Sequence, residues 1–115
     1  MDKSAVPSGI LDTNRLSVIN KALSDSTRIK ILRMLAQGRE ACCSVPPSVD
    51  APEGGICICE FVKETGLIQS LVSYHMKVLK EAGLVREQVR GKWNYYSLNR
   101  ALVREYLGAM SELLL

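Results

Sequence analysis

Four cysteines in two close pairs carry the most nucleophilic side chains of this 115-residue chain. One pair is Cys42-Cys43, and the other is Cys57-Ile58-Cys59. Thiolates are soft ligands that select thiophilic ions, and stable disulfides are rare in cytosolic proteins. The two pairs therefore indicate a site for a soft metal or metalloid ion, with thiol redox chemistry as the alternative.

The number of thiolates that coordinate together would determine which ion is bound. Three sulfurs suit a trigonal As(III) or Sb(III) site, whereas four suit Cd(II), Pb(II) or Zn(II) in a tetrahedral or related geometry. Residues 38–55 hold three prolines and three glycines but few residues that can pack, which predicts a flexible loop. Such a loop would bring Cys42, Cys43 or both to Cys57 and Cys59, in the same protomer or in the other one. We favour As(III) or Sb(III), because Cys57, Cys59 and one loop thiol are sufficient.

Apolar spacing predicts five helices around these thiols. They cover about 13–23, from the break at 24–26 to about Ala36, about 56–65, from Gln69 or Ser70 to just before Gly83, and from Arg100 to the end. Only a few residues around Gly66 separate the third helix from the fourth. Two short helices at this separation are typical of a helix-turn-helix, with Cys57 and Cys59 at the start of its first helix.

A change of period follows the fourth helix. Val85, Glu87 and Val89 alternate before Arg90-Gly91-Lys92, and three aromatic residues follow the turn. This pattern predicts a β-hairpin, in which Tyr95 and Tyr96 pack rather than stack on bases. A basic hairpin directly after a helix-turn-helix is a wing.

The positive charge of the chain is concentrated in the predicted fourth helix and hairpin. From Ile68 to Tyr96 there are five cations and two anions, so this stretch accounts for the whole net charge of +3. The cations are Lys77, Lys80, Arg86, Arg90 and Lys92, and the anions are Glu81 and Glu87. A local basic patch is the expected footprint of a phosphate-binding surface.

The last predicted helix has two apolar stripes. One comprises Leu102, Tyr106, Ala109 and Leu113, and the other comprises Val103, Leu107, Met110 and Leu114. One stripe is enough to pack a helix on its own domain, so the second predicts contact with another protomer.

In this order the features resemble those of the ArsR/SmtB family of metal-responsive repressors, from about Leu16 to Leu107. The segments that carry the resemblance are Ala22-Leu-Ser-Asp-Ser-Thr-Arg-Ile-Lys-Ile-Leu32, Cys57-Ile-Cys-Glu-Phe61, Gln69-Ser-Leu-Val-Ser-Tyr-His-Met-Lys-Val-Leu-Lys-Glu-Ala-Gly-Leu84 and Gly91-Lys-Trp-Asn-Tyr-Tyr-Ser-Leu98. The resemblance implies a mainly α homodimer with a winged helix-turn-helix of order α-α-α-α-β-β-α. It also implies that the first and last helices form the dimer interface, and that inducer binding releases operator DNA.

In this fold the second helix of the helix-turn-helix, called the recognition helix, enters the major groove. Here it is the fourth predicted helix. Its residues opposite the Val72/Leu79 stripe should face DNA: Gln69, Ser70, Ser73, Tyr74 and Lys77. The resemblance adds His75 to the DNA-facing element, with a role in packing as the alternative. On the wing, Arg86, Arg90 and Lys92 would reach the backbone or minor groove. Ser70 has a second interpretation as the helix N-cap. A dimer of this kind predicts an imperfect palindrome in double-stranded DNA.

The resemblance also informs the sensing site. Family members with Cys-x-Cys at Cys57 and Cys59 bind thiophilic ions, and many arsenite sensors have a third cysteine where this chain has Val62. The Asp, Glu and His ligands of the other common family site, on the last helix, are represented only by Glu105 and Glu112, so we expect no zinc site there. Residues two apart on an ideal helix point about 200° apart, so ion binding should distort the first turn of the third helix.

The remaining features bound the class of protein. We expect a flexible tail at 1–10 and one domain at 11–115. No apolar run is long enough to cross a bilayer, and residues 1–9 do not form a secretory signal, so we expect a cytoplasmic protein without a membrane partner. No catalytic set has suitable spacing, which argues against an enzyme. A redox-sensing repressor and a structural zinc domain remain as rival functions.

Overall fold

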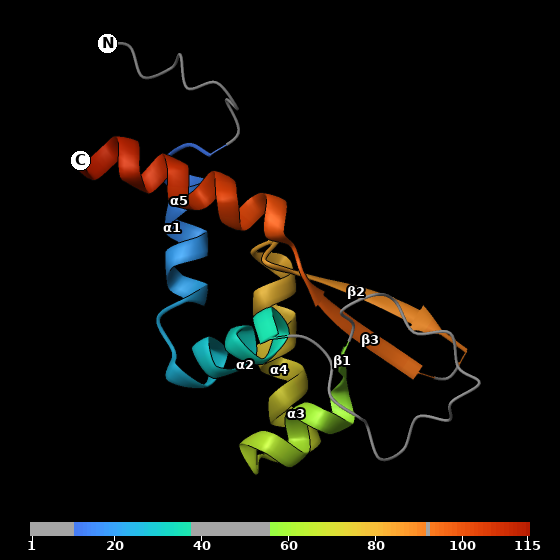
Figure 1. Ribbon diagram of the computed structural model, residues 1–115. Coiled ribbons are helices and arrows are strands. Elements are labelled where there is room, and N and C mark those ends of the chain that lie inside the picture. The colour runs from blue at the N-terminus through green and yellow to red at the C-terminus, as the bar shows by residue number, and fades with distance from the viewer. Residues whose placement is uncertain (1–10, 38–55, 92) are drawn as a thin grey trace.

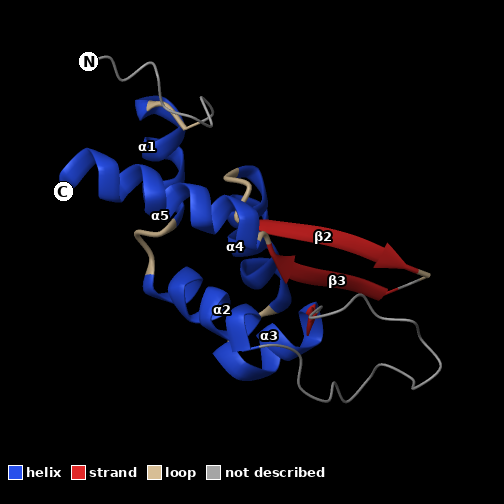
Figure 2. Ribbon diagram, turned by 45° about the horizontal axis from the view of Figure 1, so that its top comes forward, coloured by secondary structure: helices blue, strands red, loops and turns tan. Residues whose placement is uncertain are grey.

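The computed structural model describes residues 11–37, 56–91 and 93–115 (Figure 1). The expected tail at 1–10 and loop at 38–55, with Cys42 and Cys43, lie outside these residues, as does Lys92. The elements are α1 (Thr13–Ala22), α2 (Ser26–Gln37), β1 (Ile56–Cys57), α3 (Ile58–Thr65), α4 (Gln69–Glu81), β2 (Val85–Arg90), β3 (Trp93–Leu98) and α5 (Arg100–Leu114). The five predicted helices and the predicted hairpin are all present, and the hairpin projects away from the helices (Figure 2).

The sheet contains a strand that the sequence did not predict. Its order is β1-β3-β2 and both pairings are antiparallel, with Ile56 opposite Tyr96 and Cys57 opposite Tyr95. The third predicted helix was expected from about Ile56, but this is wrong, because Ile56 and Cys57 are extended and α3 begins at Ile58. A two-residue strand has no period of its own, so only its distant partner β3 reveals it.

The core lies where α1, α2 and α4 meet the base of the sheet. The predicted stripe of α4 is buried, with Val72 and Leu79 fully shielded and Met76 almost so. These side chains cluster with Ile19 of α1 and Ile31 of α2. Burying aliphatic side chains of this size stabilises a fold by roughly 1.5–3 kcal/mol each, so this cluster fixes how α4 sits in the domain.

Local signals explain where the helices begin and end. Asp12 caps α1 by accepting from the backbone N–H of Arg15 at 2.8 Å, and Asn99 caps α5 by accepting from that of Leu102 at 3.2 Å. Gly66 ends α3 at φ 74°, in the left-handed region that favours glycine. Ile68 holds the N-cap position of α4, so Ser70 lies inside the helix and is not its cap.

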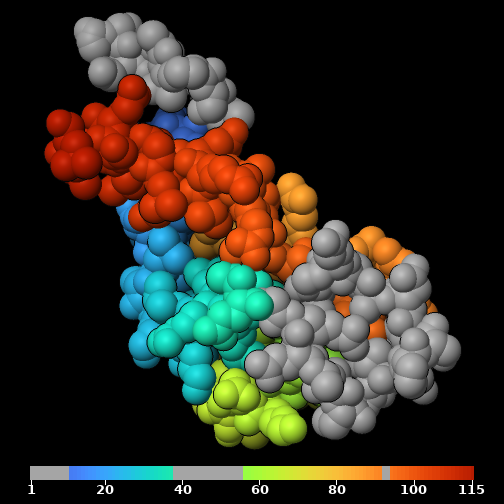
Figure 3. Space-filling view, in the orientation of Figure 1, coloured from blue at the N-terminus to red at the C-terminus, as the bar shows by residue number. Residues whose placement is uncertain are grey.

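Helix α5 crosses α1 and contacts it where the Tyr106 hydroxyl donates to Oδ1 of Asn20 (Figure 1). Leu102 of α5 is buried, but Leu107 and Leu113 are each 59% exposed and Leu114 is 69% exposed. In Figure 3, α5 in red and α3 in light green lie at opposite ends of the visible face. The C-terminal part of α5 is therefore remote from α3.

Among the described residues, no helix combines the length and the apolar character needed to span a bilayer.

Candidate functional site

The outer face of α4 carries a row of polar side chains. Gln69, Ser70, Ser73, Tyr74 and Lys77 are all exposed, whereas Val72, Met76 and Leu79 on the other side of the helix are buried. Amide, hydroxyl and ammonium groups can bond base edges and phosphates, and one α-helix fits the major groove of B-DNA. The exposed polar side of α4 therefore has the chemistry that binding in a major groove would require.

His75 does not belong to this exposed face. Its side chain is only 7% exposed, and Nδ1 lies 3.1 Å from Nη1 of Arg28 on α2. Because a guanidinium can only donate, Nδ1 of His75 accepts this hydrogen bond. The expectation that His75 faces DNA is therefore wrong, since its position next to Met76 turns the ring toward α2.

Arg28 joins three helices, which sequence reasoning missed. Its Nε donates to the carbonyl oxygen of Ala22 in α1 at 2.8 Å, while Nη1 reaches His75 in α4. The nearby Asp25 accepts from the backbone N–H of Thr27 at 2.7 Å, and this hydrogen bond lowers the pKa of that carboxyl. The network holds the recognition helix against α1 and α2. An Arg and a His 47 residues apart give no local sequence signal for it.

Arg86 and Arg90 are the hairpin cations that lie within the described residues. Nη2 of Arg86 donates to Oδ1 of Asn99 at 3.1 Å, so Arg86 lies at the base of the wing, beside the start of α5. Arg90 is half-buried at the end of β2, next to the Gly91 turn at φ 62°. Tyr95 and Tyr96 are buried, which confirms that they pack within the structure.

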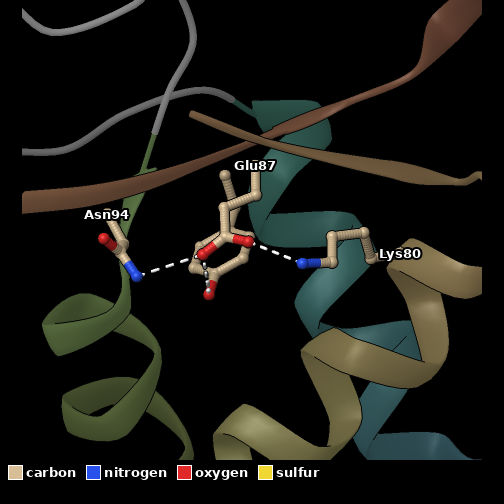
Figure 4. A network of polar contacts seen from close by, with 4 residues as sticks. Lys80, Glu87 and Asn94 are labelled. Atoms are coloured by element: carbon tan, nitrogen blue, oxygen red, sulfur yellow. Dashed lines mark hydrogen bonds and ion pairs between the residues drawn. The ribbon is translucent and has the colours of Figure 1, made fainter. Parts of the chain in front are cut away.

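The carboxylate of Glu87 on β2 lies between α4 and the hairpin (Figure 4). Its Oε1 accepts from Nζ of Lys80 at 2.6 Å, and its Oε2 accepts from Nδ2 of Asn94 at 3.0 Å and from the Tyr96 hydroxyl at 3.2 Å. The Lys80 hydrogen bond lowers the pKa of Glu87, so the carboxylate is ionised at neutral pH. Burial, then the charge of Glu87, raises the pKa of Tyr96 to about 12, so its hydroxyl stays protonated and donates.

This ion pair distinguishes two lysines of α4 that look alike in sequence. Lys80 is already neutralised by Glu87, whereas Lys77 is exposed and forms no ion pair within the described part of the chain. We expect Lys77→Ala to weaken DNA binding and to reduce the slope of log K against log salt concentration by about 1. Lys80→Ala, the matched control, should leave that slope nearly unchanged. Fluorescence anisotropy of a labelled duplex over a salt series checks this, and equal slopes for the two variants would overturn the docking.

Cys57 and Cys59 flank the start of α3. Cys57 ends β1 and holds the N-cap position of α3 in extended conformation, with only 2% of its surface exposed. Cys59 is the second residue of α3; it is half-buried and disulfide-bonded. The expected conflict between two thiols on one ideal helical turn therefore does not arise, because Cys57 is not helical. Its backbone is instead paired with Tyr95 of the wing strand β3.

The described residues do not by themselves form an ion site. Within 11–37, 56–91 and 93–115, no three His, Cys, Asp or Glu side chains gather as metal ligands would. Cys57, together with Cys59 once its disulfide is reduced, would supply two soft donors that suit a thiophilic ion but leave its coordination incomplete. Val62 follows Cys59 by three residues on α3, so the two side chains share one face of that helix.

Comparison with known proteins gives consistent matches. Residues 53–87 match the family described as "Bacterial regulatory protein, arsR family". An uncharacterised HTH-type transcriptional regulator of Methanocaldococcus jannaschii is 32% identical over 95 residues, which cover 83% of this chain and 90% of the relative. An arsenical resistance operon repressor of Bacillus subtilis is 33% identical over 92 residues, which cover 80% of this chain and 70% of the relative.

A solved structure matches the whole architecture. The homodimeric winged helix-turn-helix DNA-binding domain Mb0332 from Mycobacterium bovis aligns with a TM-score of 0.64 at 19% identity, over 98% of this chain and 87% of that one. At this identity the likeness concerns the fold alone. A winged helix-turn-helix is the fold predicted from the sequence, with α3 and α4 as the expected helix-turn-helix and β2–β3 as the expected wing.

Proposed function

This chain belongs to the ArsR family of bacterial transcriptional regulators, and from that premise we propose that it is a cytoplasmic repressor that binds operator DNA as a homodimer. We further propose that binding of As(III) or Sb(III) to its cysteine thiolates releases the operator. The observation that carries the proposal is the position of Cys57, which lies between the first helix of the helix-turn-helix and the wing strand β3.

The DNA-binding part of the proposal rests on the exposed face of α4. Gln69, Ser70, Ser73 and Tyr74 would bond base edges or phosphates, and Lys77 would neutralise a phosphate. Arg86, Arg90 and Lys92 would act from the wing at the backbone or minor groove. Two recognition helices related by a two-fold axis require an imperfect palindrome with half-sites about one helical turn, or a multiple of it, apart.

The dimeric part rests on the surface between α1 and α5. A hollow of about 420 Å³ opens there, with Leu16 of α1 and both Met110 and Leu113 of α5 in its lining. The exposed Leu107, Leu113 and Leu114 extend this apolar surface along α5. A contiguous apolar surface of this kind is typical of a protein interface, and a second copy of the chain would bury it.

The sensing part rests on the donor set. Cys57 and Cys59 would hold the ion, and Cys42 or Cys43 from the other pair would supply the third thiolate. When bound, an As(III) or Sb(III) ion would cross-link these segments through its sulfur ligands. Cd(II), Pb(II) and Zn(II) are alternatives if both Cys42 and Cys43 take part. Because Cys59 is disulfide-bonded, its reduction must come before ion binding.

Val62→Cys tests whether the loop cysteines complete the site. It places a thiol one helical turn after Cys59 on the same face of α3, so three donors would then come from residues 57–62 alone. We expect the wild-type response to As(III) to disappear when Cys42 and Cys43 are both changed to Ser. Adding Val62→Cys to that double variant should restore it. Titration of operator binding with arsenite measures both steps, and a double variant that responds normally would exclude the loop thiols.

A thiol redox sensor of the same fold is the second candidate, and the disulfide at Cys59 is the observation that favours it. The two candidates differ in the form of the protein that binds DNA. An ion sensor binds the operator when reduced and releases it on adding ion, without oxidant. A redox sensor changes its operator affinity with oxidant and ignores the ion.

The experiment that tests the proposed function is operator binding by the reduced protein, titrated separately with As(III), Sb(III), Cd(II), Pb(II), Zn(II) and an oxidant. The palindrome is first selected from random duplexes on the immobilised protein. Release by As(III) or Sb(III) supports the proposal. Release by Cd(II), Pb(II) or Zn(II) instead would identify a different inducing ion. Release by oxidant alone supports the redox sensor. No change with any addition would leave a DNA-binding protein without a sensor.

A further inference from the structure

Tyr96 of the wing strand β3 links the segment around Cys57 to the rest of the wing. Its backbone is opposite that of Ile56, the residue before Cys57, in the β1–β3 pair. Its ring contacts Phe61 of α3 edge to face, with ring centroids 6.2 Å apart. Its hydroxyl donates to the Glu87 carboxylate on β2. A rearrangement at residues 56–59 must therefore shift Tyr96 or break the pairing that holds it.

From Glu87 the contacts continue into the recognition helix. The other oxygen of the same carboxylate accepts from Nζ of Lys80, near the end of α4 (Figure 4). The Lys80 side chain is 47% exposed but that of Glu87 is only 21% exposed, so the ion pair is partly shielded from water. Partial shielding and a charge-assisted hydrogen bond make this link stronger than an ordinary surface ion pair.

We propose that Tyr96, Glu87 and Lys80 form a relay that transmits the state of the Cys57–Cys59 segment to the recognition helix. The three are positioning residues, because none of them binds the ion or reads the operator. The relay rests on the proposed function and explains how ion binding would be coupled to the recognition helix. It passes from β1 through β3 and β2 to α4, in place of the direct distortion of α3 expected from the sequence.

Tyr96→Phe cuts the relay at one end and keeps the ring that packs on Phe61. Lys80→Met cuts it at the other end and keeps the aliphatic part of the side chain. Asn94→Ala is the matched control, because Asn94 bonds the same carboxylate but lies outside the path from Tyr96 to Lys80. The measurements are operator affinity without arsenite, arsenite affinity by absorbance titration, and the ratio of operator affinities without and with saturating arsenite.

In the wild type and in Asn94→Ala we expect that ratio to lie between about 5 and 150. In Tyr96→Phe and Lys80→Met it should fall below about 2, while arsenite affinity and operator affinity without arsenite stay near those of the wild type. The relay would be overturned if Tyr96→Phe kept the affinity ratio of the wild type. It would also be overturned if Asn94→Ala lost that ratio as completely as Tyr96→Phe does.

A second readout separates failure of the relay from failure of the proposed function. Backbone amide shifts of residues 73–80 are recorded by NMR as arsenite is added to the free protein. If operator affinity of the wild type ignores arsenite, the proposed function is wrong. The relay then still stands if these shifts appear in the wild type and vanish in Tyr96→Phe, and it falls if they do not. A wild type that binds no arsenite overturns both.

Discussion

Cys57→Ser is expected to leave operator binding intact and to abolish release by As(III). Serine is a favoured N-cap residue, and position 57 is the N-cap of α3, so its hydroxyl should support the start of that helix. The variant loses a soft thiolate ligand without disturbing the exposed face of α4. The As(III) response should fall from about 5- to 150-fold to less than about twofold, measured by anisotropy of a labelled operator.

Two controls make the Cys57→Ser result specific. Mg(II), a hard ion that prefers oxygen ligands, should leave operator binding of both proteins unchanged. Circular dichroism should give the variant the helix content of the wild type. Loss of operator binding together with the response would give Cys57 a structural role, and an undiminished As(III) response would remove it from the sensing site.

Leu113→Glu is expected to separate the dimer and thereby to abolish tight operator binding. Leu113 is 59% exposed and borders the hollow between α1 and α5, so a charge there costs the protomer little. In a dimer the same charge would be buried against the second copy without a partner. Because one protomer engages only one half-site, operator affinity should fall by about 100-fold or more. Sedimentation velocity gives the mass of the particle in solution.

Ile29→Glu is the matched control for this prediction. Ile29 is 46% exposed, but it lies on α2 and borders a separate hollow with Lys30, Arg33 and Glu64. This variant should sediment as a dimer and keep its operator affinity. A dimeric Leu113→Glu protein, or separation of the dimer by both variants, would exclude the α1–α5 surface as the specific interface.

Most of the fold could be predicted because its signals are local. The α4 stripe of Val72, Met76 and Leu79 has the helical period, and all three side chains are buried. Asp12 and Asn99 accept the backbone hydrogen bonds that cap α1 and α5. These features depend on neighbours three or four residues away, which is the range over which a sequence pattern is informative.

The features that sequence reasoning missed depend on distant partners. Strand β1 exists only because Ile56 and Cys57 pair with β3, almost forty residues later in the chain. His75 is buried because Arg28 approaches it from another helix. Lys80 resembles Lys77 in sequence, and only the approach of Glu87 from the hairpin neutralises it. Each concerns the candidate site, so the site was less predictable than the fold that carries it.

The central claim is that the ion and the operator oppose each other through one protein, and thermodynamic linkage tests it most directly. The affinity of arsenite should be measured for the free reduced dimer and for the dimer saturated with its palindrome. The account predicts weaker arsenite binding on the operator, by the same factor of about 5 to 150 by which arsenite weakens operator binding. Equal arsenite affinities in the two states would contradict it.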